Sequence, residues 1–209
     1  MEKLLEVKDL KVSFFTDLGE TQAVKGAGFA IGEGDFFGIV GESGSGKSVT
    51  TKSILRLGPS NCKIMGGEIL FRGEDILKKN EAALREIRGG EIAMIFQDPM
   101  TSLDPVVTVG AQIEEMIALH ADLPRSGLRK AAEDMLEVVG IKKERFDDYP
   151  HQFSGGMRQR VVIAIAIACN PKILICDEPT TALDVTIQAQ ILELLKQLQH
   201  KYNLTIIYI

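Results

Sequence analysis

The spacing of apolar and polar positions changes several times along the chain, and each spacing predicts a different element. Near the N-terminus, apolar side chains mostly alternate with polar ones, which is the period of a strand with one buried face. Shorter apolar stretches bounded by turn residues predict further strands. The strands are expected at residues 4–15, 24–31, 36–40, 67–71, 92–96, 173–176 and 204–209. Three of them are apolar throughout and are expected to be buried, namely 36–40, 92–96 and 173–176.

Other segments have apolar residues three and four positions apart, which is the spacing of one helix face. They predict helices at residues 49–57, 81–87, 108–119, 128–139 and 185–200. Residues 163–168 alternate isoleucine with alanine, which fits a strand as well as a buried helix. The polar residues that lead up to Arg160, and the stop at Asn170 and Pro171, favour a helix over about 157–169, because a helix between strands fits a βαβ unit. The strand stays the alternative.

Strands and helices alternate over most of the chain, but one internal block has a helical pattern only. This arrangement of predicted elements indicates an α/β core into which a helical subdomain is inserted. We place the core at residues 1–97 and 157–209, and the helical subdomain at residues 98–156.

Composition restricts the classes of function. The 209 residues carry a net charge of −5, so nucleic acid is not an expected partner. The three cysteines lack metal-binding spacing and fit a reducing compartment. The N-terminus has no signal-peptide core, and the longest apolar run, 161–169, is too short to cross a bilayer. A role at a membrane would therefore be that of a peripheral subunit.

A glycine-rich loop lies between the strand expected at 36–40 and the helix after it. It comprises Gly41, Glu42, Ser43, Gly44, Ser45, Gly46, Lys47 and Ser48, and Val49 follows. A G-x-x-x-x-G-K-[ST] sequence in this context is typical of a phosphate-binding loop, because the glycines let backbone N–H groups curl around a polyphosphate. Lys47 can reach the β- and γ-phosphates, and the Ser48 hydroxyl can bind Mg²⁺. The sequence thus predicts a nucleoside triphosphate site.

Two carboxylates follow the apolar strand at 173–176, where open α/β sheets bind ligands. Asp177 is expected to hold Mg²⁺, directly or through water, and Glu178 to activate the water that attacks the γ-phosphate. Acidic residues often end strands without such a role, but the loop at 41–48 favours the functional interpretation.

A second candidate anion site precedes the helix expected at 157–169. Ser154, Gly155 and Gly156 offer an N-cap hydroxyl and free backbone N–H groups. Taken alone, these residues favour a simple capped helix after a turn over an anion site.

With these motifs in this order, the chain resembles the ATP-binding subunits of ABC transporters over nearly its whole length. Residues 153–157 (FSGGM) resemble the family signature LSGGQ, Gln97 lies where the family has its Q-loop glutamine, and residues 181–184 resemble its D-loop. The resemblance implies a P-loop NTPase (RecA-like) core with an N-terminal antiparallel β subdomain and an inserted α-helical subdomain.

Four stretches resemble the oligopeptide, dipeptide and nickel importer group: 41–43, 96–105, 149–160 and 177–190. This resemblance implies a second ABC ATPase subunit, identical or not, and two integral-membrane permease subunits. A substrate-binding protein would act indirectly. The chain would lie at the cytoplasmic face of the inner membrane as a peripheral subunit. Soluble ABC ATPases of DNA repair or translation usually carry coiled-coil insertions or tandem cassettes, which the sequence lacks.

The resemblance also implies roles for individual residues. ATP would be held between two subunits, with Lys47, Ser48, Gln97, Asp177 and Glu178 on one side. Ser154, Gly155 and Gly156 of the other subunit would close over the γ-phosphate, with Asp184 nearby. Mg²⁺ would be bound by Ser48, Gln97 and Asp177, and catalysis assigned to Glu178, Lys47 and Gln97. Phe14 is the candidate for stacking on adenine, and Phe15 is the alternative.

Two features depart from the family pattern. Met157 stands where the signature ends in glutamine, and the sequence ends at Ile209, before the position of the family's switch histidine. The second departure leaves an alternative function open, a truncated nucleotide-binding module with little or no ATPase activity.

Overall fold

The computed structural model describes residues 3–98, 102–121, 123–181 and 183–209, whose strands form two four-stranded sheets. The first sheet is antiparallel and has the order β2-β1-β4-β5. Its strands are β1 (Lys3–Thr16), β2 (Gly19–Gly32), β4 (Cys62–Phe71) and β5 (Glu74–Asp75). The antiparallel N-terminal subdomain is thereby confirmed, although the strand expected at 67–71 already begins at Cys62.

Alternation along β1 determines how this sheet packs. Leu5 and Val7 are buried on its inner face, and so are Leu10 and Val12. The change from odd to even positions falls at a register shift, where Asp9 has a φ of 45°. A bulge of this kind lets one strand keep the same face toward the core on both sides of an irregularity.

The second sheet is parallel and has the order β3-β8-β7-β6. Its strands are β3 (Phe36–Gly38), β8 (Thr205–Tyr208), β7 (Ile173–Cys176) and β6 (Ile92–Ile95). On β7, Ile173 and Ile175 join the core shared with the antiparallel sheet, while Leu174 and Cys176 join the core shared with the helices on the other face. The prediction of a strand buried on both faces is confirmed for β7 and explains its unbroken apolar run.

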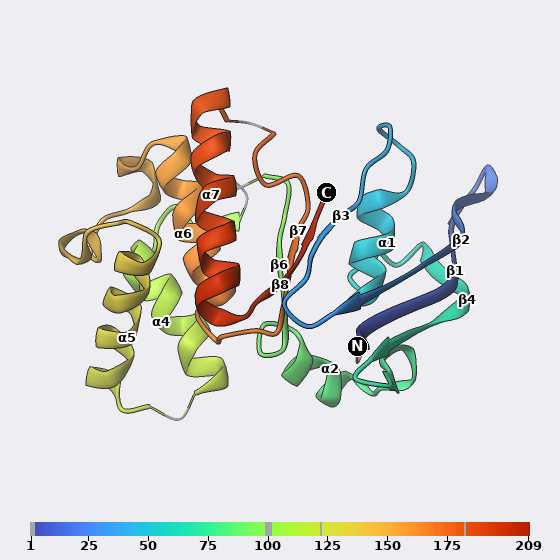
Figure 1. Cartoon of the computed structure of the whole chain (residues 1–209), viewed down its shortest axis with the longest axis horizontal. Helices are drawn as coiled ribbons and strands as arrows, with labels where there is room; N and C mark the ends of the chain where they lie inside the picture. The colour runs from blue at the N-terminus through green and yellow to red at the C-terminus, as the bar shows by residue number, and fades with distance from the viewer. Residues whose placement is uncertain (1–2, 99–101, 122, 182) are drawn as a thin grey trace.

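The helices lie on both sides of the parallel sheet. They are α1 (Lys47–Ile54), α2 (Glu81–Ile87), α4 (Val109–His120), α5 (Arg125–Val138), α6 (Gly155–Ile167) and α7 (Val185–Tyr202). Within the described ranges, three short 3₁₀ segments occur at η1 (Ile76–Lys78), η2 (Lys143–Arg145) and η3 (Pro150–Gln152). Figure 1 shows α6 and α7 on one side of β6–β8 and α1 on the other. The helix predictions for 81–87, 108–119, 128–139 and 185–200 are confirmed.

The ambiguous isoleucine–alanine run is helical, as favoured. The side chain of Ser154 caps α6 by accepting a hydrogen bond from the backbone N–H of Met157. The α6 helix contacts β6, α4, α5 and α7, so it is covered on more than one side. Neighbouring residues such as Ile163 and Ala164 are therefore both fully buried, which explains why the run is apolar throughout. The run ends just before Asn170, whose φ of 52° is not helical.

The expectation that residues 36–40 form a buried strand is wrong. β3 pairs with β8 alone and lies at the edge of the parallel sheet. Phe36 and Phe37 are half-buried, and Val40 is 94% exposed. An apolar run indicates that a segment forms a hydrophobic strand. Whether that strand lies at the centre or at the edge of its sheet depends on the rest of the fold.

The helical segment shares its hydrophobic core with the parallel sheet. Ile113 of α4 and Leu136 of α5 belong to the same buried cluster as Leu174 of β7. The boundaries set at residues 97 and 157 stay a prediction. None of the helices within the described ranges has both the length and the apolar character that crossing a bilayer requires.

Candidate functional site

The loop at 41–48 joins β3 to α1, as the sequence predicts. Gly44 and Gly46 have φ values of 78° and 91°, a backbone conformation that favours glycine. A Cβ added at Gly46 would lie 2.5 Å from the backbone oxygen of Ala23 on β2, whereas one at Gly44 would meet nothing within 4 Å. The loop therefore curls tightly against the antiparallel sheet at its last glycine.

The start of α1 suits a polyphosphate. Gly46 is the N-cap of this helix, whose first backbone N–H groups have no partner within the helix. The Lys47 ammonium donates hydrogen bonds to the backbone oxygens of Gly41 (2.8 Å) and Glu42 (2.7 Å), and thus lies over the loop itself. Helix N–H groups and a cation so placed form an anion site.

Ser48 brings this loop into contact with the first carboxylate after β7. Its hydroxyl donates a 2.6 Å hydrogen bond to Oδ1 of Asp177, whose side chain is only 1% exposed. The other oxygen, Oδ2, is buried and accepts no hydrogen bond. A buried carboxylate oxygen beside a hydroxyl oxygen provides the donor set that Mg²⁺ prefers, so these residues fit the ion.

Glu178 and Gln97 meet at the same edge of the sheet. The Gln97 amide nitrogen donates a 2.9 Å hydrogen bond to Oε2 of Glu178, and the Thr181 hydroxyl donates a 3.1 Å bond to the same oxygen. The backbone of Glu178 has a φ of 49°, an uncommon conformation for this residue type that often marks functional sites. Gln97, from a distant part of the sequence, and the nearby Thr181 therefore hold one carboxylate oxygen of Glu178 in place.

The second candidate anion site lies at the start of α6, away from the loop at 41–48. Gly155 and Gly156 lie close to α7 and the residues before it: a Cβ at Gly155 would be 3.4 Å from Leu183, and one at Gly156 would be 2.7 Å from Ile187. Because α6 and α1 flank the parallel sheet from opposite sides (Figure 1), the structure keeps the two anion sites apart. Asp184, the N-cap residue of α7, is exposed and makes no side-chain capping bond.

The adenine candidates point to opposite faces of β1. Phe14 shares a face with the buried Val12, whereas the Phe15 ring is covered by the Lys63 ammonium 5.4 Å from its centroid. An open cavity of about 1020 Å³ beside the loop is lined by Thr21, which pairs with Phe14, but not by Phe14 itself. The contact with adenine stays a prediction.

Lys52 is a site residue that the sequence reasoning missed. Its ammonium lies 3.5 Å from Oδ2 of Asp177. The available signal was its spacing, because a residue four positions after Ser48 lies one turn further along the same face of α1.

Residues 99–101 of the stretch 96–105, and residue 182 of the D-loop, lie outside the described residues.

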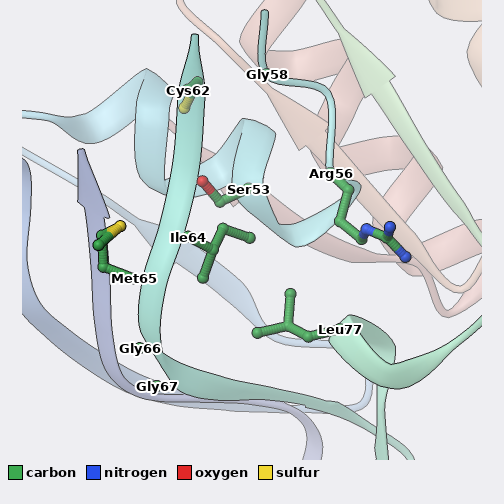
Figure 2. Close-up of a pocket in the computed structure, with 9 residues that line it drawn as sticks. All are labelled: Ser53, Arg56, Gly58, Cys62, Ile64, Met65, Gly66, Gly67 and Leu77. Carbon is green, nitrogen blue, oxygen red and sulfur yellow. The ribbon is translucent and has the colours of Figure 1, made fainter. Parts of the chain in front are cut away.

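A separate cavity of about 440 Å³ lies between α1 and β4 (Figure 2). Ser53 and Arg56 line it from the end of α1 and the turn after it, and Cys62 and Met65 line it from β4. The Arg56 guanidinium is engaged by the backbone oxygen of Lys79 and the carboxylate of Glu81. The cation in this cavity is therefore already paired, and the cavity shares no residue with the loop.

The sequence matches the family described as "ABC transporter" over residues 24–181. It is 55% identical to the oligopeptide transport ATP-binding protein OppD of Bacillus subtilis (strain 168) over 99% of this chain and 59% of that protein. It is 53% identical to the dipeptide transport ATP-binding protein DppD of the same organism, over 100% of this chain and 63% of that protein. The chain thus spans about 60% of the length of these curated relatives.

A solved structure has a similar fold. The chain superposes with a TM-score of 0.85, at 30% identity, on the dimeric ATP-binding cassette MJ0796 in a post-hydrolysis state bound to ADP and Pi. The match covers 98% of this chain and 86% of that one. The α/β core with its antiparallel subdomain and helical segment is thus a known arrangement for nucleotide binding.

Proposed function

Because the chain belongs to the ABC transporter family, we propose that it is the ATP-binding and ATP-hydrolysing subunit of an importer of peptides. The names of the curated relatives support peptides as the cargo class. One observation carries the ATPase proposal: the Ser48 hydroxyl and Asp177 are joined beside the phosphate-binding loop, next to Glu178, which Gln97 holds.

In this proposal the loop binds ATP through its polyphosphate. The N–H groups at the start of α1 donate to the phosphate oxygens, and Lys47 exchanges its bonds to Gly41 and Glu42 for bonds to the β- and γ-phosphates. Ser48, Asp177 and the amide oxygen of Gln97 would hold Mg²⁺. The ion would supply positive charge to the phosphate oxygens as the bond to the leaving group breaks.

Glu178 is the group that activates water in this scheme. Gln97 and Thr181 both donate to Oε2, which leaves Oε1 to accept a proton from a water molecule in line with the γ-phosphate. Fixing one oxygen of the carboxylate orients the other, so Gln97 and Thr181 prepare the base before ATP arrives.

We further propose that two such subunits share each ATP. The Ser154–Gly156 segment lies across the parallel sheet from α1, so it is poorly placed to reach the nucleotide of its own chain and suited to that of a second subunit. The dimeric state of MJ0796 with ADP and Pi supports this arrangement. The second subunit would be an identical chain or a related one.

The membrane permease would contact the region around Gln97 to Val109. An apolar cleft of about 460 Å³ borders this region at Ser102 and lies between the core and the helical segment. Phe96, 41% exposed, and Ser102 line this cleft, together with Met116 of α4 and Ile165 of α6. A permease segment seated here would place this chain at the inner face of the membrane as a peripheral subunit, with the substrate-binding protein on the far side.

Glu178→Gln provides the test, with Glu137→Gln on the exposed face of α5 as its matched control. The Glu178 variant should bind Mg·ATP as the wild type does and hydrolyse it at least about 100-fold more slowly, since general bases contribute factors of this size. The control should keep both properties. Unchanged hydrolysis in Glu178→Gln would contradict the assignment of the base. ATP binding without turnover by the wild-type chain would favour the alternative of a binding module.

A further inference from the structure

Asp177 needs a counter-charge whenever no metal is bound to it. It is 1% exposed, Ser48 satisfies only Oδ1, and Oδ2 is buried without a hydrogen bond. Taking a carboxylate out of water is strongly unfavourable unless a cation compensates it. The Lys47 ammonium is engaged by Gly41 and Glu42 at the other end of the loop, so it does not serve this purpose.

Lys52 has the position and the charge that Asp177 requires. Over the described part of the chain, it is the one cation in an ion pair with this carboxylate, at 3.5 Å from Oδ2. Lys52 and Ser48 are four residues apart on α1, so the helix presents a hydroxyl to one carboxylate oxygen and an ammonium to the other. The Lys52 side chain is 39% exposed, so its ammonium can return to water without leaving a buried charge behind.

We propose that Lys52 is a positioning residue for the metal site: it holds Oδ2 of Asp177 in the metal-free state and releases it when Mg²⁺ binds with ATP. The inference rests on the proposed nucleotide site and adds a residue to it. Two cations compete for one carboxylate, so the Lys52–Asp177 pair and Mg²⁺ weaken each other reciprocally. The pair keeps the carboxylate oriented for the ion, and it moderates how strongly Mg²⁺ is retained after hydrolysis.

The test compares ATP binding with and without the metal in the full chain. The dissociation constant for ATP is measured in excess Mg²⁺ and in EDTA, and the ratio of the two values gives the factor by which Mg²⁺ strengthens binding. Lys52→Met keeps the apolar stem and removes the charge, and Lys52→Arg keeps the charge. Lys130→Met, an exposed position on α5, makes the same change in net charge elsewhere.

We expect Lys52→Met to raise the Mg²⁺ factor about three- to tenfold, and to lower the Tm of the metal-free chain by about 2–4 °C. Lys52→Arg and Lys130→Met should match the wild type in both measurements. An unchanged Mg²⁺ factor in Lys52→Met would overturn the inference, even with a lower Tm, because a purely structural lysine would destabilise both states alike. A wild-type chain that binds no ATP under either condition would overturn the proposed function itself, and the inference with it.

Discussion

Gly46→Ala should destabilise the fold through the contact between the phosphate-binding loop and β2. Gly46 has a φ of 91°, and an added Cβ would lie 2.5 Å from the backbone oxygen of Ala23. The positive φ costs alanine about 1–2 kcal/mol. The overlap is with a backbone atom of a sheet, which cannot rotate away as a side chain would, and overpacking of this kind adds about 1–3 kcal/mol.

The expected loss is therefore about 2–5 kcal/mol, a large part of the roughly 5–15 kcal/mol that holds a typical domain folded. Gly44→Ala is the matched control, because its φ of 78° carries a similar strain but its Cβ would meet nothing within 4 Å. We expect the control to lose only about 1–2 kcal/mol.

Urea unfolding followed by circular dichroism measures both losses from the transition midpoints. The two variants should differ by about 1–3 kcal/mol. Equal stability of Gly46→Ala and Gly44→Ala would refute the reasoning, because it would mean that the close approach of the loop to β2 carries no energetic weight.

Two further predictions concern other parts of the chain. Ser154→Ala removes the cap that accepts from Met157 and should lower the free energy of unfolding by about 1 kcal/mol, measured by urea titration; an unchanged midpoint would contradict the cap. Burial raises the pKa of the Cys176 thiol, so iodoacetamide should label the half-buried Cys62 well before Cys176 in the folded chain, as mass spectrometry would report. Equal labelling rates would argue against the buried position of β7.

Local features of the fold were predictable because they depend on neighbouring residues. The α2 helix has the bounds that its apolar spacing predicts, and the glycine-rich loop precedes a helix as its motif requires. The helical interpretation of the isoleucine–alanine run is confirmed for α6. The sequence signals for its two ends are local, namely the capping Ser154 and the stop before Asn170. Hydrophobic periodicity and capping signals involve only a few neighbouring residues, so they predict helices and strands without knowledge of the rest of the chain.

The strand order could not be predicted in the same way. The runs at 36–40 and 173–176 look alike in sequence, yet β3 is an edge strand and β7 is buried on both faces. Periodicity tells which residues avoid water but not which element covers them, since that depends on how the whole sheet is assembled.

In the candidate site, too, local features could be predicted from the sequence, whereas contacts between distant residues could not. The sequence alone determined the chemistry, because a loop that binds phosphate and a strand that ends in two carboxylates are local patterns. Only the tertiary structure decided that Ser48 and Lys52 hold the two oxygens of Asp177, and that Gln97 and Thr181 hold one oxygen of Glu178. These contacts form because parallel strands bring their carboxyl ends to one edge of a sheet, where α1 begins. Ser48 and Asp177, 129 positions apart in the sequence, then form a hydrogen bond that no local spacing could predict.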